Sequence, residues 1–165
     1  STSTSGNIYD YKKWALEVPG VGNAKVFPLW NGPNTVKVLI VDSNMEVDET
    51  LEQTVYDHIE TVRPIGAKVM VDSPSTLNIV IKAKVRLSSG YSIQAVQNAF
   101  IQSLEEYRQS VVFEDSYISY ALIGKYLFEV DGVLDYSDLT LNEETANVTL
   151  GDEEIPTFSV KLEVM

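Results

Sequence analysis

The apolar residues of this chain change their spacing abruptly at Ser88-Ser89-Gly90, and no other feature constrains the fold as much. Before this break, residues 77–87 alternate strictly between apolar and polar, which predicts a strand with one buried face. After it, residues 92–110 carry apolar side chains three or four positions apart, which predicts an amphipathic helix. The inward strand positions are Ile79, Ile81, Ala83, Val85 and Leu87, and the helical ones are Ile93, Val96, Phe100, Leu104, Tyr107 and Val111.

The rest of the chain also mixes strands with helices. Patterning predicts strands at 22–28, 35–42, 65–71, 128–140, 145–150 and 157–164, helices at 48–63 and 116–127, and an aromatic turn or helix at 7–18. The strand at 35–42 is almost continuously apolar, which predicts a central strand buried on both faces. Asp48 or Thr50 can cap the helix at 48–63, and Thr50 with Gln53 fits a capping box. Because strands and helices do not alternate strictly, the predicted class is α+β with mainly antiparallel sheets.

The length of 165 residues allows two small domains. Two short similar segments, Val18-Pro19-Gly20-Val21 and Val130-Asp131-Gly132-Val133, each precede a pair of predicted strands. We therefore expect an N-terminal lead and aromatic segment at 1–17 and two small related units at 18–87 and 88–165, although chance explains the similarity equally well. The chain opens on Ser1 and a polar Ser/Thr run, so we also expect it to be a piece of a longer protein.

The charge is distributed unevenly along the chain. Residues 1–90 carry 9 Lys or Arg and 10 Asp or Glu, whereas residues 91–165 carry 3 and 14. The acidic half serves solubility or faces a basic partner surface. A net charge of −12 argues against general binding of nucleic acid or of an anionic membrane. No apolar run is long enough to cross a membrane.

The motifs of common catalytic and ligand sites are incomplete. Cysteine is absent and His58 is the single histidine, which excludes disulfides, thiolate sites and multi-histidine metal sites. The turn at Gly20-Val21-Gly22 lacks the third glycine of a dinucleotide site. The run from Asp42 to Asp48 lacks the glycine and the final carboxylate of a calcium loop. Neighbouring acids such as Glu105-Glu106 point apart on a helix. We therefore assign no catalytic, cofactor-binding or metal-ligating residue.

Protein interfaces are the remaining candidate sites. The outward positions of the strand at 77–87 are basic, namely Lys82, Lys84 and Arg86. The acidic half adds aromatic side chains, which favour protein contacts as well as cores. Our second candidate surface contains Tyr117, Tyr120 and Asp135.

Several long stretches resemble one protein family. The first runs from Tyr11 to Gly32 and continues with Thr-Val-Lys-Val-Leu-Ile-Val-Asp-Ser-Asn at 35–44, and the second is Arg-Pro-Ile-Gly-Ala-Lys-Val-Met-Val at 63–71. The ending agrees at 130–136, 139–142, 146–148 and 155–156. Together they resemble the baseplate J-like family of contractile-tailed bacteriophages and prophages over residues 7–165. The family's usual glycine before the strand at 35–42 is Asn34 here, which tolerates positive φ.

The resemblance implies a structural role and no enzymatic activity or cofactor. Family members are wedge components that join neighbouring wedges into a ring around the tail hub, and they usually carry a further N-terminal region. Implied partners are other wedge and hub proteins and tail tube or sheath components, in the virion baseplate after assembly in the bacterial cytoplasm. We expect the protein to form a homo-oligomer in the assembled ring and the isolated chain to be a monomer. Alternative functions are a small-molecule-binding regulatory module and a cell-wall hydrolase.

Overall fold

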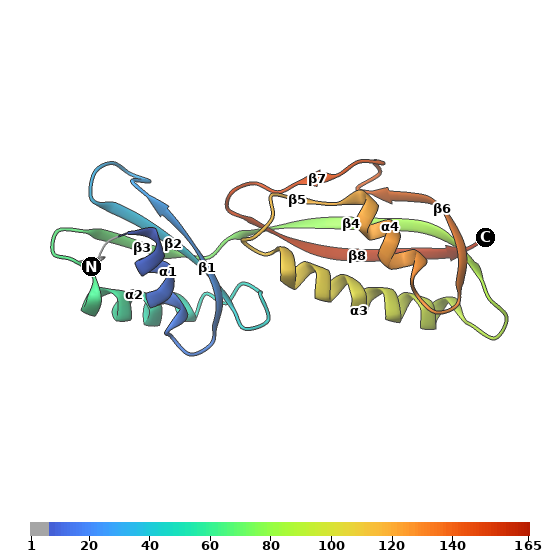
Figure 1. The fold of residues 1–165 in the computed structure, drawn as a ribbon, viewed down its shortest axis with the longest axis horizontal. Helices are drawn as coiled ribbons and strands as arrows, with labels where there is room; N and C mark the ends of the chain where they lie inside the picture. Colours follow the sequence, from blue (N-terminus) through green and yellow to red (C-terminus); the bar gives the residue numbers. More distant parts are fainter. Residues whose placement is uncertain (1–6) are drawn as a thin grey trace. The chain divides into compact units, whose positions relative to one another are not determined.

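The computed structural model describes residues 7–165, and the chain folds into two compact units that divide after Ser75 (Figure 1). Each unit has a three-stranded sheet with helices packed against it, which confirms the α+β prediction. The first unit contains α1 (Ile8–Leu16), β1 (Val21–Pro28), β2 (Thr35–Asp42), α2 (Leu51–Val62) and β3 (Lys68–Asp72). The second contains β4 (Ser75–Leu87), α3 (Ile93–Val111), β5 (Tyr117–Ile118), α4 (Tyr120–Phe128), β6 (Val133–Leu141), β7 (Val148–Thr149) and β8 (Glu154–Val164).

The first sheet has the order β1-β2-β3, with β2 in the centre as predicted. β1 pairs antiparallel to β2, whereas β3 pairs parallel to it after the crossover through α2. Val38 and Ile40 of β2 belong to the core cluster that α1 and α2 cover. Leu39 and Val41 point to the opposite face and are also fully buried. The nearly continuous apolar run of β2 is therefore explained by burial on both of its faces.

The start of α2 and the loop before β2 test two local predictions. The Thr50–Gln53 capping box is wrong, because Thr50 itself is helical and its side chain accepts no bond from the helix. Instead, the carboxylate of Asp48 accepts from the backbone N–H and the hydroxyl of Thr50. Asn34 adopts φ of 61°, so the expected left-handed turn before β2 is present without glycine.

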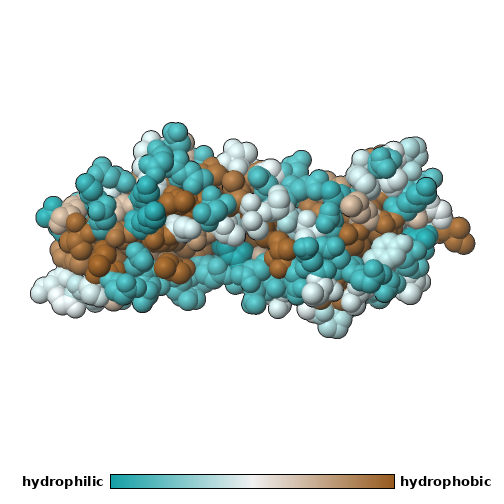
Figure 2. Space-filling model, turned by 180° about the vertical axis from the view of Figure 1, so that it is seen from behind, coloured by the Kyte–Doolittle hydropathy of each residue, from teal (hydrophilic) through white to brown (hydrophobic). Residues whose placement is uncertain are grey.

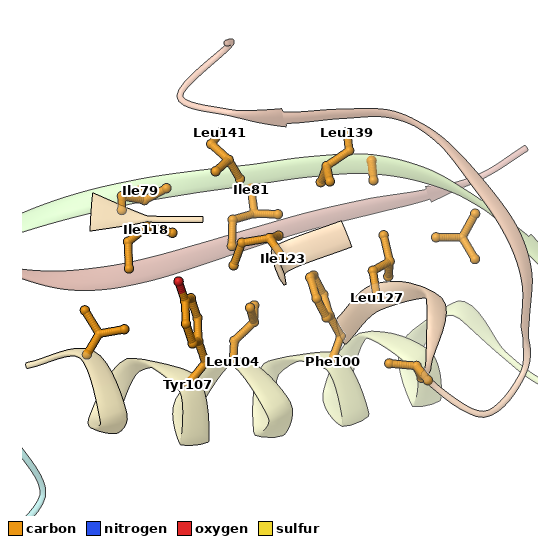
Figure 3. Packing of buried hydrophobic residues seen from close by; sticks show 14 of the residues in the cluster. Ile79, Ile81, Phe100, Leu104, Tyr107, Ile118, Ile123, Leu127, Leu139 and Leu141 are labelled. Atoms are coloured by element: carbon orange, nitrogen blue, oxygen red, sulfur yellow. The ribbon is translucent and has the colours of Figure 1, made fainter. Parts of the chain in front are cut away.

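The second sheet has the order β6-β4-β8. β6 pairs antiparallel to β4. β8 runs parallel to it, since Asn78 lies beside Thr157 and Val85 lies beside Met165. The predicted alternation of β4 is confirmed, with its apolar side chains buried and its basic side chains half-buried or exposed. Figure 3 shows Phe100, Leu104 and Tyr107 of α3 packed between their helix and this sheet.

Three elements differ from their predicted bounds or from their predicted unit. β4, expected to close the first unit at residue 87, is the central strand of the second sheet, because its apolar face packs on the helices that follow it. The helix expected at 116–127 begins at Tyr120, where the Ser119 hydroxyl caps it, and Tyr117–Ile118 pair with β7 instead. The strand expected from residue 128 begins at Val133. Within residues 7–165, no helix is long and apolar enough to span a membrane.

Candidate protein interfaces

The side of the second sheet that α3 and α4 leave uncovered carries the predicted basic residues of β4. We call this surface the charged face. Lys82 Nζ lies 2.5 Å from Glu143 Oε1, and Lys84 Nζ lies 3.7 Å from Asp138 Oδ2. The strand register sets Arg86 opposite Asp135 of β6. The face is therefore a set of opposite charges and not a continuous basic patch, since β6 and the turn after it supply a carboxylate beside each cation.

Irregular backbone in and after β6 brings these carboxylates to the lysines. The register of β4 and β6 shifts between Lys82 and Lys84, and Asp138 in the bulge has φ of 54°. Glu143 follows in a turn with φ of 68°. The hydrogen bond from Lys82 lowers the pKa of the Glu143 carboxyl. Bulges bend and twist a strand locally, so the pairing depends on this tertiary feature as much as on the alternation of β4.

The tyrosines of the second candidate surface have different environments. Tyr117 on β5 is exposed, with an exposed fraction of 48%. Tyr120 is half-buried, and its hydroxyl donates to the Leu139 carbonyl at 2.5 Å. Burial raises the pKa of Tyr120. Tyr120 therefore supports the core, whereas Tyr117 points outward, and Asp135 belongs to the charged face opposite Arg86. Whether either surface forms an interface stays a prediction.

The first unit exposes large apolar side chains that the sequence patterns did not indicate. Leu29 and Trp30 lie in the loop before β2, and Ile65 lies in the loop before β3, where its side chain is fully exposed. The two loops lie side by side, because the Lys68 N–H donates to the Asn34 carbonyl at 2.7 Å. Figure 2 shows hydrophobic areas among the hydrophilic surface on one face of the molecule. The sequence signal for these exposed side chains is the presence of large apolar residues inside loop segments rich in Gly, Pro and Asn.

Several titratable groups pair with neighbouring side chains or with the backbone. His58 of α2 contacts Glu17 after α1, with 2.8 Å between His58 Nε2 and Glu17 Oε1. Arg108 of α3 is buried and donates two bonds to Glu105, which lower the pKa of that carboxyl. Asp42 accepts from the backbone of its own turn. Across the described residues, 7–165, no three His, Asp or Glu side chains form a group that could hold a metal ion.

Comparison with known proteins identifies two adjoining domains of one family. Residues 3–73 match the baseplate J-like central domain, and residues 79–160 match the baseplate J-like protein C-terminal domain. The junction between the two matches agrees with the division of the structure after Ser75. Both the central and the C-terminal domain of the family are thus present in order.

Curated relatives agree with this assignment. The chain is 36% identical to the phage-like element PBSX protein XkdT of Bacillus subtilis (strain 168) over 162 residues, which cover 93% of this chain and 47% of XkdT. It is 35% identical to the baseplate protein gp47 of Escherichia phage Mu over 81 residues, 47% of this chain and 22% of gp47. The chain thus spans less than half the length of these curated relatives.

The fold is also found in a solved assembly. A chain in the cryo-EM structure of the anti-feeding prophage baseplate superposes with a TM-score of 0.64 over 93% of this chain and 37% of that one. The sequence identity is 11%, so this likeness concerns the fold alone. The two matched domains, which cover most of the chain, show that the chain belongs to the baseplate J-like family.

Proposed function

We propose that this protein is a structural subunit of a phage or prophage contractile-tail baseplate, where it acts as a wedge assembly component through protein contacts. The ordered match of both family domains carries the proposal, because it covers nearly all of the chain. The ion pairs found among residues 7–165 support a non-enzymatic role, since they join two groups each and do not gather into one reactive centre.

The partners under this proposal are other wedge and hub proteins and tail tube or sheath components. The site of action is the virion baseplate, after assembly in the bacterial cytoplasm. Copies of the protein meet in the assembled ring, whereas this chain by itself is monomeric. The two compact units supply stiffness, because each has its own buried core.

The direct test is co-purification. A tagged full-length protein is expressed in the lysogen that encodes it, tails are induced, and the eluate is imaged by negative-stain microscopy. Recovery of sheath, tube and wedge proteins with ring or tail particles is the expected result. A clean protein without tail components contradicts the proposal and directs attention to a small-molecule-binding module or a cell-wall hydrolase, starting with a ligand screen by thermal shift.

The charged face is the first surface to test in this assay. Reversing Lys82, Lys84 and Arg86 to glutamate would also repel the carboxylates of β6 and its turn, so glutamine replacements are the cleaner variants. We expect the triple glutamine variant to fold and to lose particles from the eluate. Intact particles at the wild-type yield exclude the charged face as an assembly contact. Lys125→Gln on α4, away from this face, is the matched control.

A further inference from the structure

β3 is one of the two outer strands of the first sheet, and among residues 7–165 no strand pairs with its outer edge. Parallel pairing uses only alternate residues of an outer strand, and the bond from Lys68 N–H to the Asn34 carbonyl shows which ones face β2. Val69 and Val71 therefore point their N–H and C=O groups away from the sheet. Within residues 7–165, β3 pairs with β2 only. Unpaired backbone groups on an outer strand are a template for another strand.

The other outer strands of the two three-stranded sheets carry features that block such pairing. β1 has a register shift near Val21 and ends in Pro28. β6 has two register shifts against β4. β8 contains Pro156 and Lys161. Among the described residues, β3 is the outer strand whose centre is regular and uncharged, as Val69-Met70-Val71. Natural proteins use bulges, prolines and charges to prevent edge pairing, and in β3 the charged residues Lys68 and Asp72 stand only at the two ends of the strand.

A groove runs along this edge. It has a volume of about 330 Å³ and lies between α2 and β3, with Glu52, Gln53, Tyr56, Val69, Met70 and Val71 as its lining. Tyr56 and the valines give it an apolar floor for side chains of an added strand. Backbone bonds to a sheet edge combined with a side-chain groove are the general arrangement for binding extended peptides.

The negative charge beside the groove favours basic side chains in a bound segment. Glu52 is the one charged lining residue, and its carboxylate is held by the Ser73 hydroxyl at 2.6 Å. Asp57 of α2 adds a second carboxylate beside the groove, since it accepts from the lining Gln53 side chain at 2.8 Å, whereas Glu60 is neutralised by Arg63 at 2.7 Å. We propose that the β3–α2 groove binds an extended segment of a partner protein, added as a strand to β3, with alternating apolar and basic side chains. This inference does not depend on the baseplate role.

A short peptide of alternating valine and lysine is the probe, and the whole protein labelled with ¹⁵N is the target. Titration at low salt should shift the amide signals of Val69 and Val71 and slow their hydrogen exchange at least about tenfold. The same peptide methylated on its backbone nitrogens should lose binding, because it cannot donate to the edge. A peptide with glutamate in place of lysine should bind at least about fivefold more weakly.

Two variants separate the backbone and charge contributions. Val71→Pro removes an outward N–H without a bond to β2, so the sheet should persist while peptide affinity falls at least about tenfold. Val164→Pro at the edge of β8 is the matched control and should leave affinity unchanged. Glu52→Gln keeps an acceptor for Ser73 but removes the charge, so the preference for lysine over glutamate should narrow.

Three results would overturn the inference. One is the absence of shifts at Val69 and Val71 with the lysine peptide. Another is an affinity of the methylated peptide equal to that of the unmethylated peptide. The third is concentration-dependent protection of these amides without peptide, which would show that a second copy of the chain occupies the edge.

Discussion

At the scale of single residues, Gly22 has a steric requirement that its motif does not reveal. It is the extra residue where β1 shifts register against β2, and a Cβ there would lie 2.2 Å from the Asp42 carbonyl oxygen. Gly22→Ala should lower the free energy of unfolding by about 2 kcal/mol, because the clash is with backbone. Urea denaturation measures this. Gly151→Ala is the control, since its nearest neighbour is the flexible Glu154 side chain at 3.1 Å, and a loss as large as that of Gly22→Ala would contradict the explanation.

The Glu105–Arg108 pair gives a residue-scale dependence on pH. The bonds from Arg108 lower the pKa of Glu105 below its ordinary value of 4.5. The pair therefore adds stability above that pKa, and the contribution disappears as the pH falls through the lowered folded pKa. Glu105→Gln should reduce stability to urea at pH 7, and the difference from wild type should shrink at about pH 3. If the stability difference between Glu105→Gln and wild type is the same at both pH values, this linkage is excluded. Glu106→Gln changes an exposed neighbour and controls for the effect of a charge removed from the same helix.

At the scale of elements, the helices differ in how they begin. The Ser92 hydroxyl accepts from the Ala95 N–H at 3.1 Å and caps α3. The Thr50 side chain makes no such bond for α2. Ser92→Ala should therefore cost about 1 kcal/mol, and Thr50→Ala clearly less. Thermal or urea unfolding of the two variants checks the order, and a larger loss at Thr50 would contradict the structural account of the caps.

At the scale of the whole molecule, the two units have separate cores. Phe100 is fully buried in the cluster of the second unit (Figure 3), and Val55 is buried in that of the first. Phe100→Ala should cost about 3–5 kcal/mol within the second unit. Hydrogen exchange should show lost protection in residues 76–165 and retained protection in the first unit, with the reverse for Val55→Ala. Loss of protection across both units in either variant would show that they unfold together.

The sequence by itself determined most of the helices and strands and the family. The alternation of β4 and the helical spacing of α3 are local patterns, and burial of one face is sufficient to produce them. The left-handed turn at Asn34 also follows from residue type. These features needed no knowledge of which segments meet in space.

The tertiary structure alone decided which sheet contains β4 and which carboxylates lie beside Lys82 and Lys84. It also decided that β3 runs parallel to β2 and that β8 runs parallel to β4. Alternation states that one face of a strand is buried, but not which helix buries it. Strand partners depend on contacts between residues far apart in the chain, and the same patterns allow several pairings. The carboxylates that neutralise the lysines come from a bulge and a turn whose backbone only the folded sheet defines.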